Sequence, residues 1–296
     1  MDVSVCIVNL NAGALLRDSL RSLYEHTAGL ELEVIVVDNG SSDGSPALIR
    51  SEFPQVNVIE NQGNLGFTRP TNQAMQAAQG DFILLLNPDT LVLPGAVQNL
   101  VGFLREYPEV GICGPKILNR DGTLQMPCRR GLARPWNTIS YFLGLAALFP
   151  KRKFFSGYTM TYLDENTAHA VDGVSGACML IRRAVIDRIG YFDERYFAYQ
   201  EDADYCYQAQ KAGWQIFYVP SAQIIHYGGQ GGSRVQPLRS IIEWHRSYYL
   251  FYRKNLAKDY FFLINWLYYL AMLLKLGLAL ITNFFRREKY AGPKRG

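Results

Sequence analysis

Apolar runs of strand length alternate with helical periodicities along residues 1–89. Between the runs, apolar residues recur every three or four positions, as on one face of a helix. The predicted strands are 3–11, 32–40, 57–63 and 81–89, and the predicted helices between them are 12–27, 45–53 and 69–79. This alternation predicts an α/β fold with a mostly parallel central sheet and helices on both faces, although it does not give the strand order.

The last of these strands leads directly into a turn that carries an acid. Phe82–Leu86 is an unbroken apolar run, which is typical of a strand buried on both faces, and Asn87, Pro88 and Asp89 follow it. Ligands of open parallel sheets bind beyond the C-terminal ends of the strands. We therefore expect the Asp89 carboxylate to lie at a ligand-binding edge.

Beyond Asp89 the pattern is less regular. It predicts helices over 94–108 and 200–211, a strand over 110–122, and a strand that ends at His226 before a glycine-rich loop at 228–233. We expect that loop to close over a ligand. The stretch 125–166 is aromatic, basic and irregular, and we interpret it as a mobile loop or a partial cover.

An apolar segment of helical length occupies Phe261–Phe285, and Lys275 is its only charged residue. It is long enough to cross a bilayer, for which ~20 apolar residues suffice, but a central lysine penalises insertion. Three arrangements are open: a spanning helix, a helix that lies in the membrane interface, and a helix packed on the main domain or on a partner. We divide the chain into a main domain over 1–229 and a basic, apolar, membrane-associating helical region over 230–296.

The charge is divided unevenly between these two parts. From Gln230 onward there are twelve Lys or Arg and three acids, a net charge of +9, whereas residues 1–229 carry a net charge of −5. The basic residues flank an apolar helix and do not form a continuous polar stripe. A membrane surface therefore fits them better than nucleic acid does.

The cysteines and the N-terminus indicate a reducing compartment. The five cysteines are odd in number, widely spaced and without a Cys-x-x-Cys pair, which fits neither a disulfide framework nor a zinc cluster. Residues 1–11 show no basic n-region and no apolar h-region of a secretion signal. We expect a cytoplasmic protein that is peripheral to, or anchored at, the membrane.

Small polar residues end each of the predicted strands. They are Asn9, Asn11, Asp38, Asn39, Ser41, Asn61, Asn64, Asn87 and Asp89. Because parallel strands end at one edge of a sheet, these side chains can together bind a base edge, ribose hydroxyls and a metal-bound diphosphate. Each residue taken alone is also an ordinary turn former or helix cap.

The usual phosphate-binding signatures are missing from the sequence. It contains no G-x-x-x-x-G-K-[ST] and no G-x-G-x-x-G after the first strand, which argues against a P-loop enzyme and a dinucleotide oxidoreductase. A diphosphate bound without such a loop usually needs a divalent cation, and Mg²⁺ or Mn²⁺ takes few protein oxygens. Asp89 can supply one of them.

A second group of acids, Glu201, Asp202 and Asp204, opens the predicted helix 200–211. The helix dipole favours acids at this position, so capping is one explanation. Rings nearby instead predict an aromatic-walled pocket with a base at its floor, able to deprotonate a hydroxyl nucleophile. The rings are Tyr196, Phe197, Tyr199, Tyr205 and Tyr207. His226 is either structural or a second metal ligand.

Seven segments together resemble glycosyltransferase family 2, most closely its bacterial rhamnosyltransferase-type members, which build cell-surface polysaccharide such as O-antigen. They are SVCIVNLN, EVIVVDNGSSDGS, NQGNLGFTRPTN, LLLNPDT, VDGVSGACMLIRR, FDERYFAYQEDADYC and HYGGQGGS, in that order, and they cover roughly Val3 to Lys254. The resemblance implies a GT-A fold, the nucleotide-diphospho-sugar transferase fold. It also implies a nucleotide-diphosphate sugar donor, Mg²⁺ or Mn²⁺, and an inverting displacement.

The resemblance also implies roles for single residues. Asp38 would bond the pyrimidine base, and Val8 and Asn9 would line the nucleotide. Asp89 and His226 would hold the metal. Asp202 would be the general base that deprotonates the acceptor hydroxyl.

Asn87 and Arg69 depart from the family pattern. Asn87 stands where the D-x-D motif has its first acid, and it would serve the ribose or a metal-bound water. Arg69 replaces a residue that is commonly small, and it either adds a phosphate contact or covers the start of a helix.

The remaining site residues follow from their places in these motifs. We assign Asn11 and Asn64 to the nucleotide, and Glu201 and Tyr199 to the acceptor.

In this interpretation residues 1–229 are the catalytic domain, with a nucleotide-binding half over about 1–115 and an acceptor-binding half over about 116–229. The expected donor is dTDP-rhamnose, with a UDP-hexose as the alternative. The expected acceptor is a glycan or a polyprenyl-diphosphate-linked sugar at the cytoplasmic face of the inner membrane.

Two other functions are open. A nucleotidyltransferase would also use a sheet-edge Asp with Mg²⁺, but it needs a basic glycine-rich signature near its first strand, where only Arg17 is present. A non-catalytic membrane protein could keep the fold, although the joint presence of Asp89, Asp202 and His226 argues against it.

Overall fold

The computed structural model describes residues 1–229 and 237–285 of the chain. The loop at 228–233 that we expect to close over a ligand therefore lies mostly outside the described residues. In the part described, a nine-stranded sheet has the order β3-β2-β1-β4-β10-β6-β11-β5, and β8 pairs with β11. Its strands are β1 (Val3–Asn9), β2 (Leu32–Asp38), β3 (Asn57–Glu60), β4 (Phe82–Leu86), β5 (Thr90–Val92), β6 (Val110–Leu118), β8 (His169–Ala170), β10 (Cys178–Arg182) and β11 (Gln215–His226).

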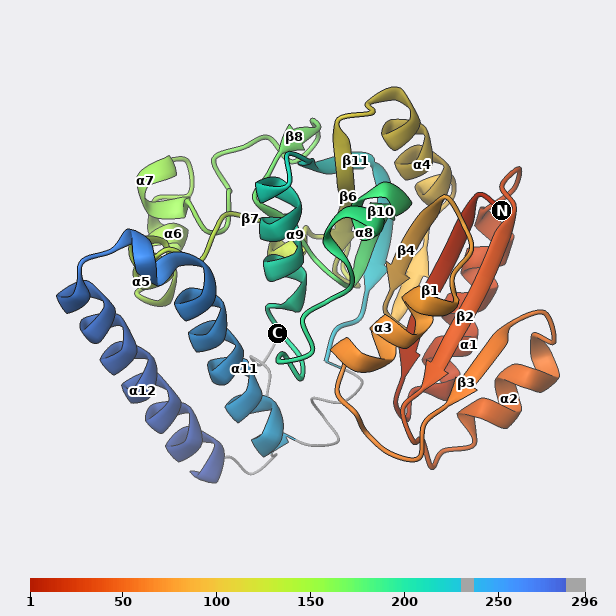
Figure 1. Cartoon of the computed structure of the whole chain (residues 1–296), viewed down its shortest axis with the longest axis horizontal. Coiled ribbons are helices and arrows are strands. Elements are labelled where there is room, and N and C mark those ends of the chain that lie inside the picture. Colours follow the sequence, from red (N-terminus) through yellow and green to blue (C-terminus); the bar gives the residue numbers. More distant parts are fainter. Residues whose placement is uncertain (230–236, 286–296) are drawn as a thin grey trace.

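The helices cover both faces of this sheet and continue beyond it (Figure 1). They are α1 (Gly13–His26), α2 (Ser45–Glu52), α3 (Thr68–Ala77), α4 (Ala96–Glu106), α5 (Pro135–Phe142), α6 (Leu145–Leu148), α7 (Lys153–Ser156), α8 (Arg183–Ile189), α9 (Glu201–Lys211), α11 (Pro237–Phe251) and α12 (Phe262–Phe285). Short helical turns are η1 (Met126–Cys128), η2 (Tyr252–Leu256) and η3 (Ala257–Asp259). The predicted α/β class is confirmed.

The sheet brings the ends of strands from distant parts of the chain to one edge. Strand β1 pairs in parallel with β2 and β4, and β2 pairs in parallel with β3, as the alternation of elements predicts. Strand β10 runs antiparallel between β4 and β6, and β11 runs parallel to β6. The C-terminal ends of β1, β2, β4, β6 and β11 and the N-terminal end of β10 therefore lie at the same edge.

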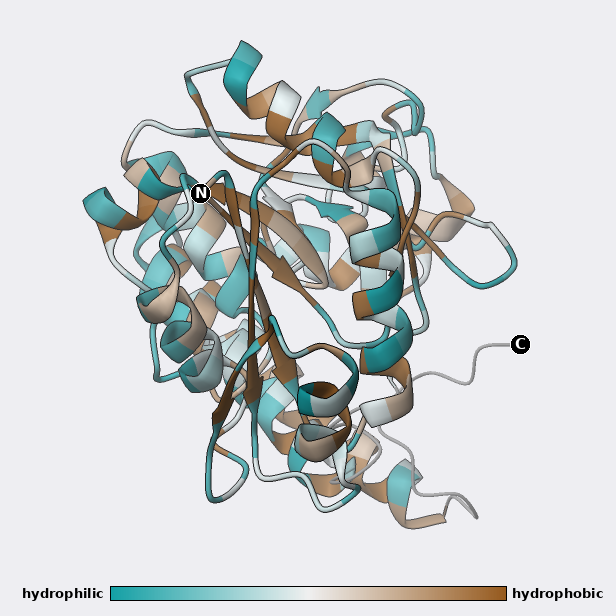
Figure 2. Ribbon diagram, turned by 90° about the vertical axis from the view of Figure 1, so that its right-hand side faces the viewer, coloured by the Kyte–Doolittle hydropathy of each residue, from teal (hydrophilic) through white to brown (hydrophobic). Residues whose placement is uncertain are grey.

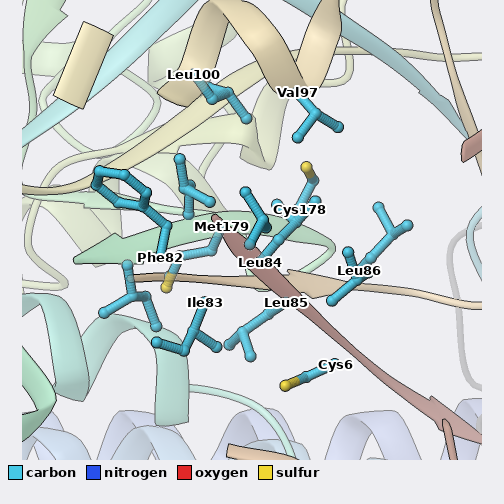
Figure 3. Packing of buried hydrophobic residues seen from close by; sticks show 14 of the residues in the cluster. Cys6, Phe82, Ile83, Leu84, Leu85, Leu86, Val97, Leu100, Cys178 and Met179 are labelled. Carbon is cyan, nitrogen blue, oxygen red and sulfur yellow. The ribbon is translucent and has the colours of Figure 1, made fainter. Parts of the chain in front are cut away.

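Strand β4 lies in the middle of the core. All five of its residues are buried, as predicted from the apolar run. In Figure 3, Val97 and Leu100 of α4 lie on one side of the strand and Cys6 of β1 lies near it. Figure 2 shows the sheet as a hydrophobic layer between helices with hydrophilic outer turns. This rigid strand fixes the position of the Asn87-Pro88-Asp89 turn.

The stretch 125–166 is more ordered than a mobile loop. It forms η1, α5, α6, α7 and β7 (Arg129–Arg130), and β7 pairs with β9 (Gly173–Val174). The Trp136 indole Nε1–H donates to the Phe154 carbonyl (2.8 Å), and the two rings pack with centroids 4.9 Å apart. Local aromatic packing thus orders a segment that has no clear periodicity.

The C-terminal helices extend the molecule at one end. Figure 1 shows α11 and α12 at the end opposite to α2 and β3. The described residues include one helix, Phe262–Phe285, that is long and apolar enough to cross a membrane by length and composition. Lys254 in η2 contacts Asp193 (2.8 Å) and Asp204 (2.7 Å), which ties these helices to α9.

The loop before α3 contacts the loop before α9 at Gly66. The Phe67 backbone N–H donates to the Phe197 carbonyl oxygen (2.6 Å). Gly66 has φ +94°, and a Cβ atom there would lie 2.3 Å from that same oxygen. Glycine is required here for both its backbone conformation and its lack of a side chain.

We predict that Gly66→Ala destabilises the protein by two separate costs. The left-handed backbone costs an L-residue about 1–2 kcal/mol, and the clash with Phe197 adds overpacking of about 1–3 kcal/mol. Gly44→Ala is the matched control, because Gly44 has φ +80° but nothing within 4 Å of its Cβ position. Urea denaturation should show the larger loss for Gly66→Ala; equal losses would contradict the clash.

Candidate active site

Asn9 and Asp38 end the neighbouring strands β1 and β2, and they lie opposite each other in the register. Asn9 is fully buried, and its Nδ2 donates to Asp38 Oδ1 (2.8 Å) and Ser41 Oγ (3.2 Å). The Ser41 backbone N–H donates to Asp38 Oδ2 (2.8 Å). Asn9 Oδ1 is buried without a hydrogen-bond partner among the described residues, so a bound ligand could satisfy it.

Asn11 and Asn64 hold the loops that flank this cluster. Asn11 has φ +52°, its N–H donates to Ser41 Oγ (2.9 Å), and its Oδ1 accepts from the Ser42 N–H (2.8 Å). Asn64 Oδ1 accepts from Asn39 Nδ2 (3.1 Å). The hydrogen bonds of both residues thus hold the loops at the ends of β1 and β3, and their assignment to the nucleotide stays a prediction.

Val8 lies in a strand of the sheet, whereas Arg69 lies on the surface of a helix. Val8 is partly exposed beside the buried Asn9 in β1. Arg69 lies in the first turn of α3, where its Nε is 3.2 Å from Glu194 Oε2 in an exposed ion pair. Such pairs contribute about 0–1 kcal/mol, so Arg69 is held only weakly in this position.

Asn87, Asp89 and His226 meet at the next part of the same edge. His226 Nε2 lies 3.2 Å from Asp89 Oδ1 and 3.3 Å from Asn87 Nδ2. These contacts join the end of β4 to the end of β11. The predicted position of His226 at a strand end is confirmed, and the structure brings it to the turn that carries Asp89.

Gln125 determines which nitrogen of the His226 ring is available. Its Nε2 donates to the His226 carbonyl (3.1 Å) and to Asn119 Oδ1 (3.1 Å), so its Oε1 faces His226 Nδ1 at 2.7 Å. Because an amide oxygen can only accept, Nδ1 carries a proton and donates it to Gln125. In the neutral ring the lone pair is then on Nε2, the nitrogen that faces Asp89 and Asn87.

This pair of side chains fits a divalent cation that is bound mostly through a ligand's phosphates. A buried carboxylate and an oriented imidazole lone pair are both metal ligands, and Gln125 supplies the outer hydrogen bond typical of metal-binding histidines. The described residues contain no group of three or more His, Cys, Asp or Glu suited to hold a metal. A cation at Asp89 and His226 would therefore need further oxygens from the ligand or from water.

Asp202, in the first turn of α9, forms a buried ion pair with Arg130 of β7. Arg130 Nη2 contacts Asp202 Oδ2, and the two side chains are only 12% and 11% exposed. Burial alone would lower the pKa of Arg130, but the Asp202 carboxylate raises that pKa above its usual range. Asp202 also accepts from the Gly176 N–H (2.9 Å, to Oδ2) and the Ala203 N–H (2.7 Å, to Oδ1).

Glu201 stands next to Asp202 in a different electrostatic environment. Burial, together with the charge of Asp202, raises the pKa of Glu201 to about 8. Glu201 Oε2 is buried without a hydrogen-bond partner in the described part of the chain. This environment therefore favours the protonated form of the Glu201 carboxyl.

One short segment connects this acidic cluster to the metal-ligand pair. The Gly176 N–H bonds Asp202, and the carbonyl of the next residue, Ala177, accepts from the Asn87 N–H (2.9 Å). The second contact continues the antiparallel ladder in which Cys178 of β10 lies opposite Leu86 of β4. Asp202 and the Asn87-Pro88-Asp89 turn are thus held by two adjacent residues, Gly176 and Ala177.

The aromatic residues around the acids do not form one pocket wall. The Tyr205 hydroxyl donates to Gly190 (3.0 Å), whereas the Tyr207 hydroxyl donates to Asn255 in η2 (3.3 Å). Residues two positions apart point to different sides of a helix, so the predicted five-ring pocket is wrong. Tyr199 (φ +69°) and Gln200 (φ +62°) precede α9 in left-handed conformations, which are strained for non-glycine residues and are of the kind found at functional sites.

Sequence reasoning missed Arg130 and Gln125. Both lie in the stretch interpreted as an irregular cover, far along the chain from the residues that they contact. The only signal was an Arg-Arg pair among aromatic residues, and no spacing rule connects it to α9.

A family profile described as Glycosyl transferase family 2 matches residues 4–190. The chain belongs to glycosyltransferase family 2. This transferase is 31% identical over 231 residues to the N-acetylglucosaminyl-diphospho-decaprenol L-rhamnosyltransferase of Mycobacterium tuberculosis, covering 74% of each chain. It is 27% identical over 157 residues to rhamnosyltransferase WbbL of Escherichia coli K12, covering 51% of this chain and 53% of that protein.

Solved structures show the fold of the transferase. Mannosyltransferase PcManGT from Pyrobaculum calidifontis, in complex with GDP-Man and Mn²⁺, has a TM-score of 0.60 and 19% identity, covering 86% of this chain and 64% of that chain. GalNAc-T7 with UDP, GalNAc and Mn²⁺ has a TM-score of 0.60 and 17% identity, covering 86% and 48%. The predicted GT-A fold is confirmed, and the family makes the protein a nucleotide-sugar glycosyltransferase.

The raised pKa of Glu201 predicts a pH-dependent stability difference. The folded state holds the Glu201 proton until about pH 8, whereas the unfolded state releases it near the ordinary glutamate pKa of 4.5. Between these two pH values the ionisation of Glu201 therefore lowers the stability of the folded protein as pH rises. Glu201→Gln removes the titration. The Tm of Glu201→Gln minus that of the wild type should therefore grow from about pH 5 to about pH 8. A constant difference would contradict the buried, protonated carboxyl.

Proposed function

We propose that this transferase moves rhamnose from dTDP-rhamnose to a hydroxyl of a lipid-linked or polysaccharide acceptor. The observation that carries the proposal is the 31% identity, over 74% of both chains, to a mycobacterial L-rhamnosyltransferase. The E. coli rhamnosyltransferase adds support. A UDP-hexose donor is the alternative, because the sugar is selected by a few atoms of a pocket.

The nucleotide would bind at the edge formed by β1, β2 and β4. Asp38, held by Asn9, would accept from the pyrimidine base, and the unsatisfied Asn9 Oδ1 would accept from the ligand. Val8, Asn11, Asn64, Arg69 and Asn87 would line the same edge. In this proposal residues 1–115 are the nucleotide-binding half and 116–229 the acceptor-binding half.

Asp89 and His226 would hold Mg²⁺ or Mn²⁺ against the diphosphate. The support is their 3.2 Å contact and the hydrogen bond that orients the His226 ring toward Gln125, together with the Mn²⁺ in the complexes of PcManGT and GalNAc-T7. A divalent cation bound there supplies charge neutralisation to the leaving diphosphate. Arg69 can leave its weak surface pair with Glu194 to reach a phosphate.

Asp202 would act as the general base. Its carboxylate would take the proton from the attacking acceptor hydroxyl, the new glycosidic bond would form on the face opposite to the departing nucleotide diphosphate, and the anomeric configuration would invert. Arg130 compensates the buried charge and, with the Gly176 N–H, fixes the carboxylate in place. Glu201 and Tyr199 lie within three residues of this base in the chain and would contact the acceptor.

The acceptor in this proposal is a polyprenyl-diphosphate-linked sugar or a growing glycan, as the name of the mycobacterial relative suggests. Such an acceptor places the enzyme at the cytoplasmic face of the inner membrane. The apolar helix Phe262–Phe285 is consistent with that location.

The proposed donor is tested by calorimetric titration and donor hydrolysis with dTDP-rhamnose and the common UDP- and GDP-sugars, in Mn²⁺, Mg²⁺ or EDTA. We expect cation-dependent selection of dTDP-rhamnose. Asp89→Asn should remove the cation dependence and weaken binding by about 1.5–3 kcal/mol, the size of a charge-assisted contact. Selection of a UDP-sugar would establish the alternative donor, and binding of no donor would overturn the catalytic assignment.

The role of Asp202 is tested separately from donor binding. Asp202→Asn should lower kcat by about 10²–10⁴-fold, the usual contribution of a general base, while donor affinity stays near the wild-type value. Asp187→Asn, at an exposed position of α8, is the matched control and should be fully active. A fully active Asp202→Asn enzyme would refute the assignment.

A further inference from the structure

Helix α12 presents two different faces. Tyr268, Met272 and Asn283 are buried on one side. The residues of the other side are all more than half exposed: Trp266, Leu270, Leu273, Leu274, Leu278, Ile281, Phe284 and Phe285. Because successive helical residues are ~100° apart, these two stripes lie on opposite sides of the helix. The outer stripe is entirely apolar apart from the indole N–H.

The single charge of α12 belongs to the inner side. Lys275 Nζ lies 3.8 Å from the Trp244 ring centroid, 4.3 Å from the Phe142 ring centroid and 3.3 Å from His245 Nε2. His245 Nδ1 donates to the Ile241 carbonyl (2.8 Å), which leaves Nε2 free to accept from the ammonium. A helix that left the protein to cross a bilayer would lose all these contacts and carry a lysine into hydrocarbon.

Two further polar side chains of α12 are hydrogen-bonded on the protein side or within the helix. Asn265 Nδ2 donates to the Ala257 carbonyl (3.0 Å), and its Oδ1 accepts from the Tyr252 hydroxyl (2.5 Å). The Thr282 hydroxyl donates to a carbonyl in its own helix (3.0 Å). The helix is therefore built to lie against α11 with its apolar side outward.

A second exposed apolar element lies beside α12. Leu143, Leu148 and Phe154 are between 65% and 70% exposed, and Phe149 is 46% exposed. Phe142 joins this element to α12 through its contact with Lys275. Figure 1 places α5, α6 and α7 at the same end of the molecule as α11 and α12.

The charges around this apolar surface are positive. Residues 122–163 contain six Lys or Arg and no acid. Three of them, Lys151, Arg152 and Lys153, are exposed between Phe149 and Phe154. Such a surface complements anionic headgroups, whereas a second copy of the chain would bring like charges together.

We propose that the outer stripe of α12 and the exposed apolar residues of α5–α7 form one bilayer face, which inserts in the plane of an anionic membrane so that α12 lies along the membrane without crossing it. The proposal deepens the membrane location given above. It does not depend on the donor or on catalysis.

The bilayer face is rigidly connected to the proposed base. Ser247 Oγ in α11 donates to the Ala198 carbonyl (2.8 Å), and Lys254 and Asn255 in η2 both contact Asp204 of α9. Membrane binding through α12 therefore positions α9, whose first turn carries Asp202, relative to the lipid surface.

Flotation of the full chain with vesicles tests the bilayer face, without nucleotide sugar so that the result is independent of the donor assay. We expect binding to phosphatidylcholine vesicles that contain phosphatidylglycerol, and weaker binding to pure phosphatidylcholine. Leu274→Glu should lower the partition coefficient by at least about tenfold, because a leucine leaves hydrocarbon. Tyr107→Glu, at an exposed apolar residue at the end of α4, is the matched control and should bind normally.

Two further variants keep the test meaningful if Leu274→Glu misfolds. Phe149→Glu should weaken binding although it lies outside α12. The paired change Lys151→Gln with Lys153→Gln should weaken binding to the anionic vesicles by about fivefold for each charge removed and leave binding to neutral vesicles unchanged. Normal binding by both would overturn the proposal of one bilayer face.

Depth measurement separates a helix in the plane from a spanning helix. All five native cysteines are buried, so a spin label attaches selectively at Trp266→Cys, Leu274→Cys or Phe284→Cys. An in-plane helix places the three labels at similar depths, about 5–10 Å below the headgroup boundary. A label at position 274 near the bilayer centre, about 15 Å deep, would show a spanning helix and overturn the proposal.

Absence of binding to either kind of vesicle would also overturn the proposal of a bilayer face. In that case a concentration-dependent dimer in analytical ultracentrifugation, lost in Leu274→Glu, would assign the same face to a second copy of the chain.

Discussion

The register of β10 against β4 is the constraint on which the active site depends. Strand β10 runs antiparallel to both of its neighbours, β4 and β6. It therefore brings its N-terminal end to the ligand-binding edge, where β4 and β6 have their C-terminal ends. Gly176 and Ala177 reach the edge in this way, and each uses one backbone group, an N–H for Asp202 and a carbonyl for Asn87. Since a slip of one residue would turn every side chain of β10 to the opposite face, the buried residues of the strand protect this arrangement.

The ion pair between Arg130 and Asp202 has a different energetic role from the backbone hydrogen bonds of Gly176 and Ala177. A buried ion pair adds little net stability, because desolvation of both charges offsets their attraction, whereas loss of one partner leaves a buried charge at a cost of about 3–5 kcal/mol. The pair therefore restricts the orientation of Asp202 more than it stabilises the fold. Glu201, one residue earlier, has no such partner in the described residues, and burial raises the pKa of its carboxyl.

Much of the nucleotide-binding half was predictable from the sequence because its elements are local. The run Phe82–Leu86 indicates a buried strand, and residues that end parallel strands must share an edge, so Asn9, Asp38 and Asp89 could be placed without coordinates. Contacts between distant segments could not be predicted. Gln125 and Arg130 reach His226 and Asp202 through antiparallel pairings and short helices for which periodicity gives no register. The aromatic pocket failed for a related reason, since nearness in sequence to an acid does not determine the side of a helix on which a ring lies.

The link from Lys254 to Asp193 and Asp204 has a consequence for the choice of acceptor. It joins η2 both to α9 and to the loop before it, so α11 and α9 move as one body. With α12 in the membrane plane, as proposed, this body acts as a spacer of fixed height between the lipid surface and Asp202. A sugar hydroxyl then reacts only if its distance from the lipid anchor matches that height. The enzyme would therefore select acceptors by the length of their glycan as well as by the identity of their sugars.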